Sequence, residues 1–361
     1  MLEKIKCFLE KKPNKKAREI SKNINQSRKD VNACLYGNLD YFIKDDKHCW
    51  SLIPTSELIV EFPADQWVDC KSFENSLLHA GSPLDSDCQT IVFIVPQNCK
   101  ILLDAAARFL ALCNQIIDEK KKVKIDFSQC ATTLSYFDRN GFLQQLDSRI
   151  DILPKRPKKS KASTYKGNNT GVVEFGAIEL GVVNKDLINR LTDSFVAQSS
   201  SVYEGAASTV FGELIGNVNE HSEATMLGFA ALQKYTGNRK HIQTVVSDSG
   251  LGIAETLKPS LKDNYPSLHK LNDADDFDLQ IVLAVLTKGE ISRFGSGRGL
   301  GFKSSREQAI KFNARLSVRQ ENFALEIEYK DGVPKTVNKQ VDLATIRGTH
   351  LCFDFFVDQS G

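Results

Sequence analysis

The stretch "VFGELIGNVNEHSEA", residues 210–224, has the spacing of a helix but carries more polar groups than a buried helix tolerates. Glu213 and Asn217 are four residues apart, so a helix places both side chains on one face. Asn219 and Glu220 are expected on the solvated side. A solvated face would explain all these polar groups, whereas a binding site would explain only the first pair. The apolar face consists of Phe211, Leu214, Ile215 and Val218.

The composition is that of a folded protein with several domains. The chain has 361 residues, 41% of them hydrophobic, which is enough for two or three domains with sizeable cores. A net charge of +2 does not mark the whole molecule as a polyanion binder. Residues 1–50, however, hold 12 Lys and Arg against 7 Asp and Glu, an excess of 5 positive charges.

The cysteines indicate the compartment. Nine cysteines are scattered without a CxxC pair, and we find neither a signal peptide nor an apolar run long enough to span a membrane. We therefore expect reduced thiols in a cytoplasmic protein that does not contact a membrane. No Cys/His cluster has the spacing of a zinc site.

Residues 1–55 have the pattern of a winged helix-turn-helix. Three short helices are followed by "YFIKDDKHCWSLI", which alternates about a turn as a two-stranded wing would. Ser27 is a good N-cap for the segment "SRKDVNACLYG". This helix would present a surface suited to phosphate and groove contacts, made of Arg28, Lys29, Asn32 and Tyr36.

The same segment, followed by a tryptophan in the wing, resembles the Z-nucleic-acid-binding winged helices. Asn32 and Tyr36 match the paired contact residues of that family, and Trp50 matches its wing tryptophan. The family's wing prolines are replaced by Lys47 and His48. The resemblance implies binding to DNA or RNA, while a protein-docking role remains the alternative.

Residues 56–152 are expected to form a small α/β domain. "CQTIVFIVP" predicts a buried strand, "CKILLDAAARFLALCNQIIDE" a long amphipathic helix, "KKVKIDFSQC" a second strand and "FDRNGFLQQLDSRI" the start of a helix. The run 123–146 resembles the STAS domains of bacterial anti-anti-sigma factors, but residues 138–141 lack the serine that is phosphorylated there. The resemblance implies a docking domain for a protein partner. The basic segment 153–170 that follows is expected to be a linker or flexible loop.

The remaining residues, 171–361, carry four motifs in a fixed order. They are Glu-x-x-x-Asn on the helix quoted above, Asp-x-Gly-x-Gly after the strand "HIQTVV", the glycine run "GSGRGLG" opening a helix, and Gly-Thr before a last strand. Together these motifs resemble the GHKL ATPases, the family of gyrase and the histidine kinases. The resemblance implies a Bergerat fold, a mostly antiparallel sheet covered by helices, which gives the whole chain an α/β (α+β) multidomain architecture.

The resemblance also implies an ATP site with Mg²⁺. Asn217 matches the residue that holds the metal, and Glu213 matches the catalytic carboxylate that orients or deprotonates the attacking group. Asp248 matches the acceptor of the adenine amino proton, helped by Thr349. The glycines match positions where the backbone passes close to the nucleotide. The further cofactor-binding residues implied are Gly250, Gly252, Gly297, Arg298, Gly299, Leu300 and Gly301. Residues 254–296 would form the lid, a polar loop leading into an apolar helix.

Several functions agree with this resemblance. The first is an ATP-dependent conformational switch that hydrolyses ATP slowly and changes its contacts with a partner or a nucleic acid. The second is a serine/threonine kinase like the anti-sigma factors, and the third is a nucleic-acid-binding regulator whose ATP site does not hydrolyse. A histidine kinase is disfavoured, because only His48 and His79 precede residue 200 and neither lies on a dimerisation helix pair.

Overall fold

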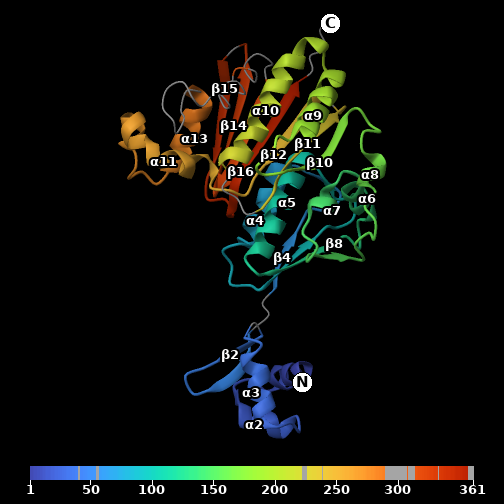
Figure 1. The fold of residues 1–361 in the computed structure, drawn as a ribbon, viewed down its shortest axis with the longest axis vertical. Helices are drawn as coiled ribbons and strands as arrows, with labels where there is room; N and C mark the ends of the chain where they lie inside the picture. The colour runs from blue at the N-terminus through green and yellow to red at the C-terminus, as the bar shows by residue number, and fades with distance from the viewer. Residues whose placement is uncertain are drawn as a thin grey trace. The chain divides into compact units, whose positions relative to one another are not determined.

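The computed structural model describes residues 1–39, 41–53, 57–221, 226–237, 239–288, 307, 314–331 and 333–356 (Figure 1). The chain forms two compact units. The first unit is Met1–Glu57 with Asp87–Thr90, and the second is Leu58–Ser86 with Ile91–Gly361. The parts that resemble a STAS domain and an ATP-binding domain therefore pack into one body. It is a mixed α/β protein with parallel and antiparallel strand pairs.

The first unit has the predicted order of three helices and a hairpin. Ser27 caps the third helix, because its Oγ accepts a hydrogen bond from the Asp30 N–H at 3.1 Å. One small core, which includes Val31 and Trp50, holds the unit together. Its sheet has the order β1-β3-β2. The elements are α1 (Leu2–Lys11), β1 (Lys15–Lys16), α2 (Ala17–Asn23), α3 (Arg28–Tyr36), β2 (Phe42–Lys44) and β3 (Cys49–Leu52).

The second unit begins with a four-stranded sheet of order β4-β6-β8-β9, in which β8 and β9 are parallel. The same segment of the chain also forms a short parallel pair of strands, β5 and β7. The strands are β4 (Glu57–Glu61), β5 (Trp67–Val68), β6 (Thr90–Ile94), β7 (Lys100–Ile101), β8 (Lys122–Asp126) and β9 (Asp151–Leu153). The helices are α4 (Cys70–Ala80), α5 (Leu103–Asp118), α6 (Ala131–Arg139), α7 (Phe142–Gln145) and α8 (Ala162–Tyr165).

A larger, fully antiparallel sheet follows, with the order β10-β11-β12-β16-β13-β14-β15. The last strand of the described residues, β16, thus lies in the middle, between β12 and β13. The strands are β10 (Val172–Ile178), β11 (Gly228–Tyr235), β12 (His241–Ser247), β13 (Arg315–Glu321), β14 (Phe323–Lys330), β15 (Val333–Gln340) and β16 (Ile346–Phe356). The helices are α9 (Lys185–Gln198), η1 (Ser201–Tyr203), α10 (Glu204–His221), α11 (Gly252–Asn264), α12 (Pro266–His269) and α13 (Phe277–Lys288).

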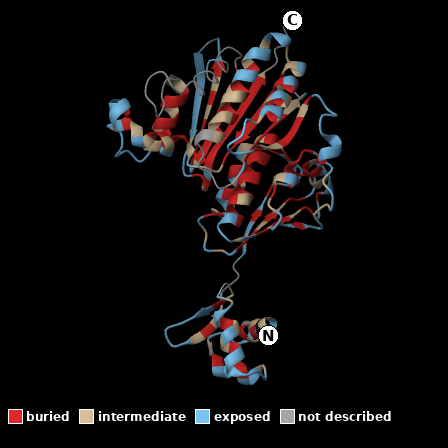
Figure 2. Cartoon of the chain, in the orientation of Figure 1, coloured by how far each residue is buried: buried red, intermediate tan, exposed pale blue. Residues whose placement is uncertain are grey.

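The two faces of this sheet have different partners. On β12, Ile242 and Val246 belong to the apolar core shared with α9, α10, α11 and α13. The alternate residue Gln243 points to the other face, where its Oε1 accepts a hydrogen bond from the Asp104 N–H of α5 at 3.1 Å. Helix α5 packs against β12 and β16 and also against β8. It is therefore buried on nearly all sides, as the red helix at the centre of Figure 2 shows.

Three local predictions need correction. The helix expected to start within 137–150 is only the short α7, which begins at Phe142, and the first residues of that segment are the end of α6 at Arg139; Gly141, with a φ of +81°, separates the two helices. The long helix expected from residue 99 begins at Leu103, because Lys100–Ile101 form β7. The polar lid segment after residue 252 is helical over α11, with Pro259 inside it.

The basic segment 153–170 is attached to the second unit at several points. The Arg156 guanidinium donates hydrogen bonds to four backbone carbonyl groups, among them that of Asp147 at 2.7 Å. Ala162 is buried at the start of α8. The Lys161 N–H donates to the Asp138 carboxylate at 3.1 Å. The segment that was expected to be a linker or flexible loop is therefore bonded to the rest of the second unit.

Candidate functional site

Asp248 and Thr349 lie side by side, because β16 is inserted next to β12. The Asp248 N–H donates to the Thr349 carbonyl oxygen at 2.9 Å. The Asp248 carboxylate accepts hydrogen bonds from the Gly250 N–H at 2.8 Å and from the Thr349 hydroxyl. Gln320 of β13 donates to the Thr349 Oγ1 at 2.8 Å and so orients this hydroxyl. The structure thus brings together three of the predicted site residues, Asp248, Gly250 and Thr349. The first and the last of them are 101 positions apart in the sequence.

Asp248 is an unusual carboxylic acid. Burial raises its pKa to about 6, although the hydrogen bonds from Gly250 and Thr349 act in the opposite direction. At neutral pH the carboxylate is mostly ionised, although its burial makes the charged form less favourable than it would be in water. Such a carboxylate is well suited to accept a hydrogen bond from a bound ligand.

Two glycines let the backbone turn closely around Asp248. Gly348 has a φ of +87°, and a Cβ there would come within 2.2 Å of the Asp248 carbonyl oxygen. Gly252 has a φ of +79° at the start of α11, and a Cβ there would lie 3.0 Å from Gln320 Nε2. Gly252 was a predicted site residue. Gly348 was missed, although it lies in the Gly-Thr motif and any side chain there would displace the Asp248 backbone.

Helix α10 carries the other predicted pair. The predicted apolar stripe is confirmed, since Phe211, Leu214, Ile215 and Val218 are all buried. Glu213 and Asn217 are half-buried, and α10 packs against β12, the strand that leads to Asp248. The Asn217 Nδ2 is buried and has no hydrogen-bond partner within the described residues. An unpaired buried amide calls for an explanation, and a bound polar ligand would be one.

Asn219, which was expected on the solvated side, is half-buried and has partners in a neighbouring loop. Its Oδ1 accepts a hydrogen bond from the Gly181 N–H at 2.5 Å, and its Nδ2 donates to the Val182 carbonyl at 3.1 Å. It therefore fixes the loop between β10 and α9. The predicted phosphate-loop residues Gly297, Arg298, Gly299, Leu300 and Gly301 lie outside the residues that the structure describes.

The backbone around Asp248 and Thr349 is also held from the face of the sheet opposite the apolar core. The sequence analysis did not identify the residues that hold it. Gln115 of α5 contacts Ser249 and Arg347, which adjoin Asp248 and Thr349. His350 is buried, and burial together with Arg319 and Arg108 lowers its pKa to about 3, so the ring is neutral. Its Nε2 lies 3.0 Å from the Arg347 carbonyl oxygen and must carry the proton. Its Nδ1, 3.2 Å from the Ser247 Oγ, then accepts from that hydroxyl.

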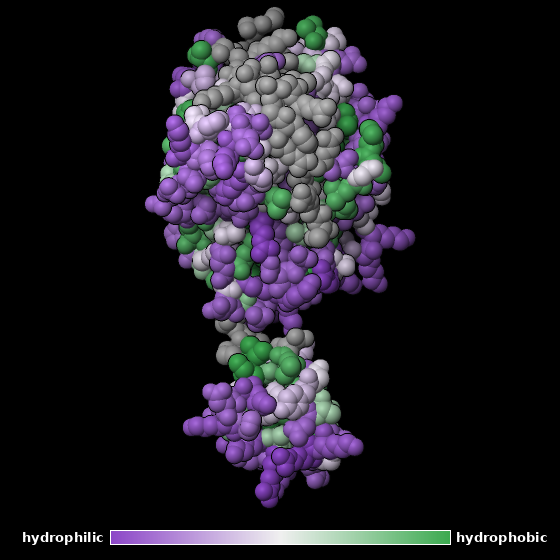
Figure 3. Space-filling view, turned by 60° about the vertical axis from the view of Figure 1, so that its left-hand side comes forward, coloured by the Kyte–Doolittle hydropathy of each residue, from purple (hydrophilic) through white to green (hydrophobic). Residues whose placement is uncertain are grey.

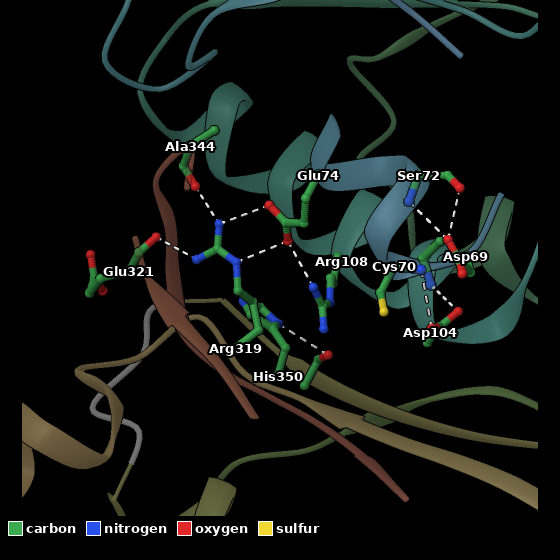
Figure 4. A network of polar contacts seen from close by, with 12 residues as sticks. Asp69, Cys70, Ser72, Glu74, Asp104, Arg108, Arg319, Glu321, Ala344 and His350 are labelled. Carbon is green, nitrogen blue, oxygen red and sulfur yellow. Dashed lines mark hydrogen bonds and ion pairs between the residues drawn. The ribbon is translucent and has the colours of Figure 1, made fainter. Parts of the chain in front are cut away.

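A buried ionic network continues from this side (Figure 4). Glu74 of α4 binds Arg319 of β13 at 2.9 Å and Arg108 of α5 at 2.8 Å. The Arg319 guanidinium also donates to the carbonyl groups of Glu321 and Ala344. These contacts join α4 and α5 to the large sheet, so the helices and the sheet share one polar core.

A second candidate site lies on α3 in the first unit. All four predicted residues lie along this helix, with Arg28, Lys29 and Tyr36 exposed and Asn32 half-buried. The Tyr36 ring stands edge-on to the buried Trp50 ring, at 5.0 Å between centroids and 89° between planes. Lys44 in the wing, which sequence reasoning missed, donates to the Tyr36 hydroxyl at 2.9 Å. In Figure 3, hydrophilic residues gather along one side and the lower end of this unit, while hydrophobic residues lie in its upper part.

Other predicted features can be compared with the structure. All nine cysteines are free thiols. In the described ranges, no three His, Cys, Asp or Glu side chains gather as a metal site would require. None of the helices resolved in those ranges is both long and apolar enough to cross a membrane.

The chain was compared with protein-family models, with curated proteins and with solved structures, and none of the three comparisons found a match.

Proposed function

We propose that the second unit binds ATP with Mg²⁺ through a GHKL-type site of the Bergerat fold. The observation that carries the proposal is the buried pair of Asp248 and Thr349, held between two close backbone turns. The large antiparallel sheet with helices α9, α10, α11 and α13 on the face that bears this pair supports the same fold. The ordered sequence motifs led to these residues independently of the structure.

The chemistry of Asp248 suits adenine. An adenine ring offers an exocyclic amino donor, and a buried carboxylate is a strong acceptor for it. Thr349 contributes a hydroxyl that Gln320 and Asp248 already orient. Guanine presents a carbonyl oxygen at the same ring position, which a carboxylate would repel. The site should therefore select ATP over GTP.

Helix α10 supplies groups for the phosphate end. Asn217 would hold the metal ion through its amide oxygen, a hard ligand that Mg²⁺ accepts. The Asn217 Nδ2 has no hydrogen-bond partner among the described residues, and a bound phosphate would accept its hydrogen bond. Glu213, one turn earlier, would orient or deprotonate the attacking water or hydroxyl. Bound Mg²⁺ would neutralise phosphate charge.

We favour an ATP-dependent switch with slow hydrolysis over the two alternatives, a serine/threonine kinase and a non-hydrolysing regulator. The hydrogen bonds of Asp104 and Gln115 on α5 to the large sheet and its loop support a switch, because they connect the ATP-binding part to the STAS-like part. Incubation with γ-labelled ATP separates the three activities. Free phosphate indicates the switch, labelled protein the kinase, and bound, unchanged ATP the non-hydrolysing regulator. A protein partner of the STAS-like part would have to use its outer surface, since α5 is buried.

A second function is proposed for the first unit, which we expect to bind nucleic acid. The edge-on contact of Tyr36 with Trp50 and the hydrogen bond from Lys44 support it. Together they hold an exposed aromatic ring on the helix that also carries Arg28 and Lys29, with Lys44 of the wing beside the ring. This arrangement would present one stacking surface and several phosphate contacts. Left-handed duplexes are the substrate to test first.

A further inference from the structure

Gln115 lies at the point where α5 meets the proposed nucleotide site. Its side chain is completely buried, in the last turn of the helix. The Nε2 donates to the Ser249 Oγ at 2.9 Å and to the Arg347 carbonyl oxygen at 2.9 Å. The Oε1 accepts from the Arg347 N–H at 3.0 Å. One amide therefore holds two backbone segments that are far apart in the sequence.

These two segments are the ones that carry the candidate adenine-binding groups. Ser249 follows Asp248 directly, and Arg347 precedes Thr349 by two residues. Between them, Gly348 passes so close to Asp248 that a Cβ would overlap its backbone. A small movement of either segment would therefore change the distance between the Asp248 carboxylate and the Thr349 hydroxyl.

Helix α5 is itself firmly attached to the sheet, so Gln115 acts from a fixed position. Two N–H groups at its amino end have no partner within the helix. The Leu103 N–H donates to the Tyr235 hydroxyl at 2.9 Å, and the Asp104 N–H donates to Gln243 at 3.1 Å. Beyond the other end of the helix, Glu119 forms an ion pair with Arg347 at 2.5 Å.

We infer that Gln115 is a positioning residue for base recognition: from the STAS-like part, it sets the relative placement of Asp248 and Thr349 and hence the preference for adenine. This inference rests on the proposed ATP function. It also gives the STAS-like part a direct contact with the nucleotide site, because Gln115 of α5 bonds to both segments that carry the candidate adenine-binding groups.

The matched control is the neighbouring residue on the same helix. Asn114 also bridges backbone groups through its amide, accepting from the Asp147 N–H at 2.9 Å and donating to the Gln145 carbonyl at 3.1 Å. Its partners lie beside α7 rather than beside Asp248. Asn114→Leu and Gln115→Leu thus remove similar hydrogen bonds, but only the second removes them from the nucleotide loop.

The test measures binding of Mg-ATP and of purine riboside triphosphate, which lacks the adenine amino group, by calorimetry on the full chain. The wild type should prefer ATP. Gln115→Leu should weaken ATP binding about tenfold, the size expected for loss of a buried hydrogen bond, and leave the analogue nearly unchanged. Asn114→Leu should keep the wild-type preference. Hydrogen exchange without nucleotide should rise in segments 247–252 and 346–350 only in the Gln115 variant.

The outcomes are distinguishable. An equal loss for both nucleotides in Gln115→Leu, or an unchanged ratio, would show a merely structural role and overturn this inference alone. A wild type that binds neither nucleotide would overturn the proposed function and this inference with it. If Gln115→Leu does not fold, Gln115→Glu serves instead. It keeps the acceptor for the Arg347 N–H and loses the donor to the Arg347 carbonyl, and a retained preference for ATP would again contradict the inference.

Discussion

The Glu74 carboxylate and the Arg319 guanidinium form a buried, two-pronged ion pair, although the residues are 245 positions apart. The two hydrogen bonds measure 2.9 Å and 3.2 Å, and both side chains are at most 2% exposed. Burial alone would raise the pKa of Glu74, but Arg319 and Arg108 outweigh it and the pKa is lowered. The pair therefore attaches α4 to the large sheet through charge.

Replacing this carboxylate should destabilise the whole second unit. Glu74→Gln leaves two buried guanidinium groups without a counter-charge, and we expect it to lower the free energy of unfolding by about 3–5 kcal/mol. Glu328→Gln, which breaks the more exposed pair with Arg239, should cost under about 1 kcal/mol. Urea unfolding at pH 7 measures both. Because the folded pKa of Glu74 is lowered, its contribution should disappear as the pH falls through that pKa. Similar costs for the two variants would contradict the assigned role.

Asp248 should have the opposite effect on stability. Its pKa is raised to about 6 in the folded chain, so folding favours the protonated form. Its contribution is fully present below the unfolded pKa of about 4 and is lost as the pH rises through 6. Asp248→Asn should therefore unfold at a higher temperature than the wild type at pH 7.5, by the equivalent of about 1–3 kcal/mol, and show little difference at pH 4. A variant less stable at pH 7.5 would argue for a structural carboxylate.

Glu213 should affect turnover rather than binding. Removing a group that orients or deprotonates the attacking nucleophile lowers rates by about 10²-fold or more. Glu213→Ala should therefore bind ATP with nearly wild-type affinity and release phosphate at least 10² times more slowly. Glu204→Ala, at the exposed first turn of the same helix, is the control. Parallel losses of binding and turnover in Glu213→Ala would instead place this residue in the phosphate site.

The salt dependence of nucleic-acid binding tests the first unit. Removing one cation that binds a phosphate should flatten the slope of log affinity against log salt by about 0.9 for duplex DNA. Arg28→Ala with Lys29→Ala should thus bind more weakly at low salt, with a slope shallower by nearly two. Lys11→Ala with Lys12→Ala, at the end of α1, should change the slope less. Gel shifts with right-handed and left-handed duplexes provide the measurement. The absence of any shift at the lowest salt would leave a protein-docking module.

Sequence patterns predicted what depends on local periodicity. The apolar stripe of α10 and the cap at Ser27 agree with the structure. The neighbouring placement of Asp248 and Thr349 also agrees with it, but this expectation came from the resemblance of the ordered motifs and not from local periodicity. The helix α11 was missed because its charged residues and Pro259 hid the buried spacing of Ile253, Leu257 and Leu261.

Long-range polar contacts escaped sequence reasoning for a different reason. Gln115 and Glu74 lie on helices that look merely amphipathic, and their partners Ser249 and Arg319 are 134 and 245 residues away. Nothing local identifies such a pair, because the contact exists only once α5 has packed between the two sheets. The sequence also did not predict that α5 is buried on nearly all sides, because its apolar spacing is already explained by one buried face.

Calorimetric titration of the full chain with Mg-ATP and Mg-GTP tests the central claim most directly. The account predicts that the wild type binds ATP and binds GTP more weakly, and that Asp248→Asn loses ATP affinity by about 1–3 kcal/mol through an unpaired buried donor. It also predicts that wild-type affinity for ATP falls as the pH drops below about 6, where Asp248 becomes protonated. Equal affinity for the two nucleotides, or undiminished ATP binding by Asp248→Asn, would contradict the assignment of an adenine site.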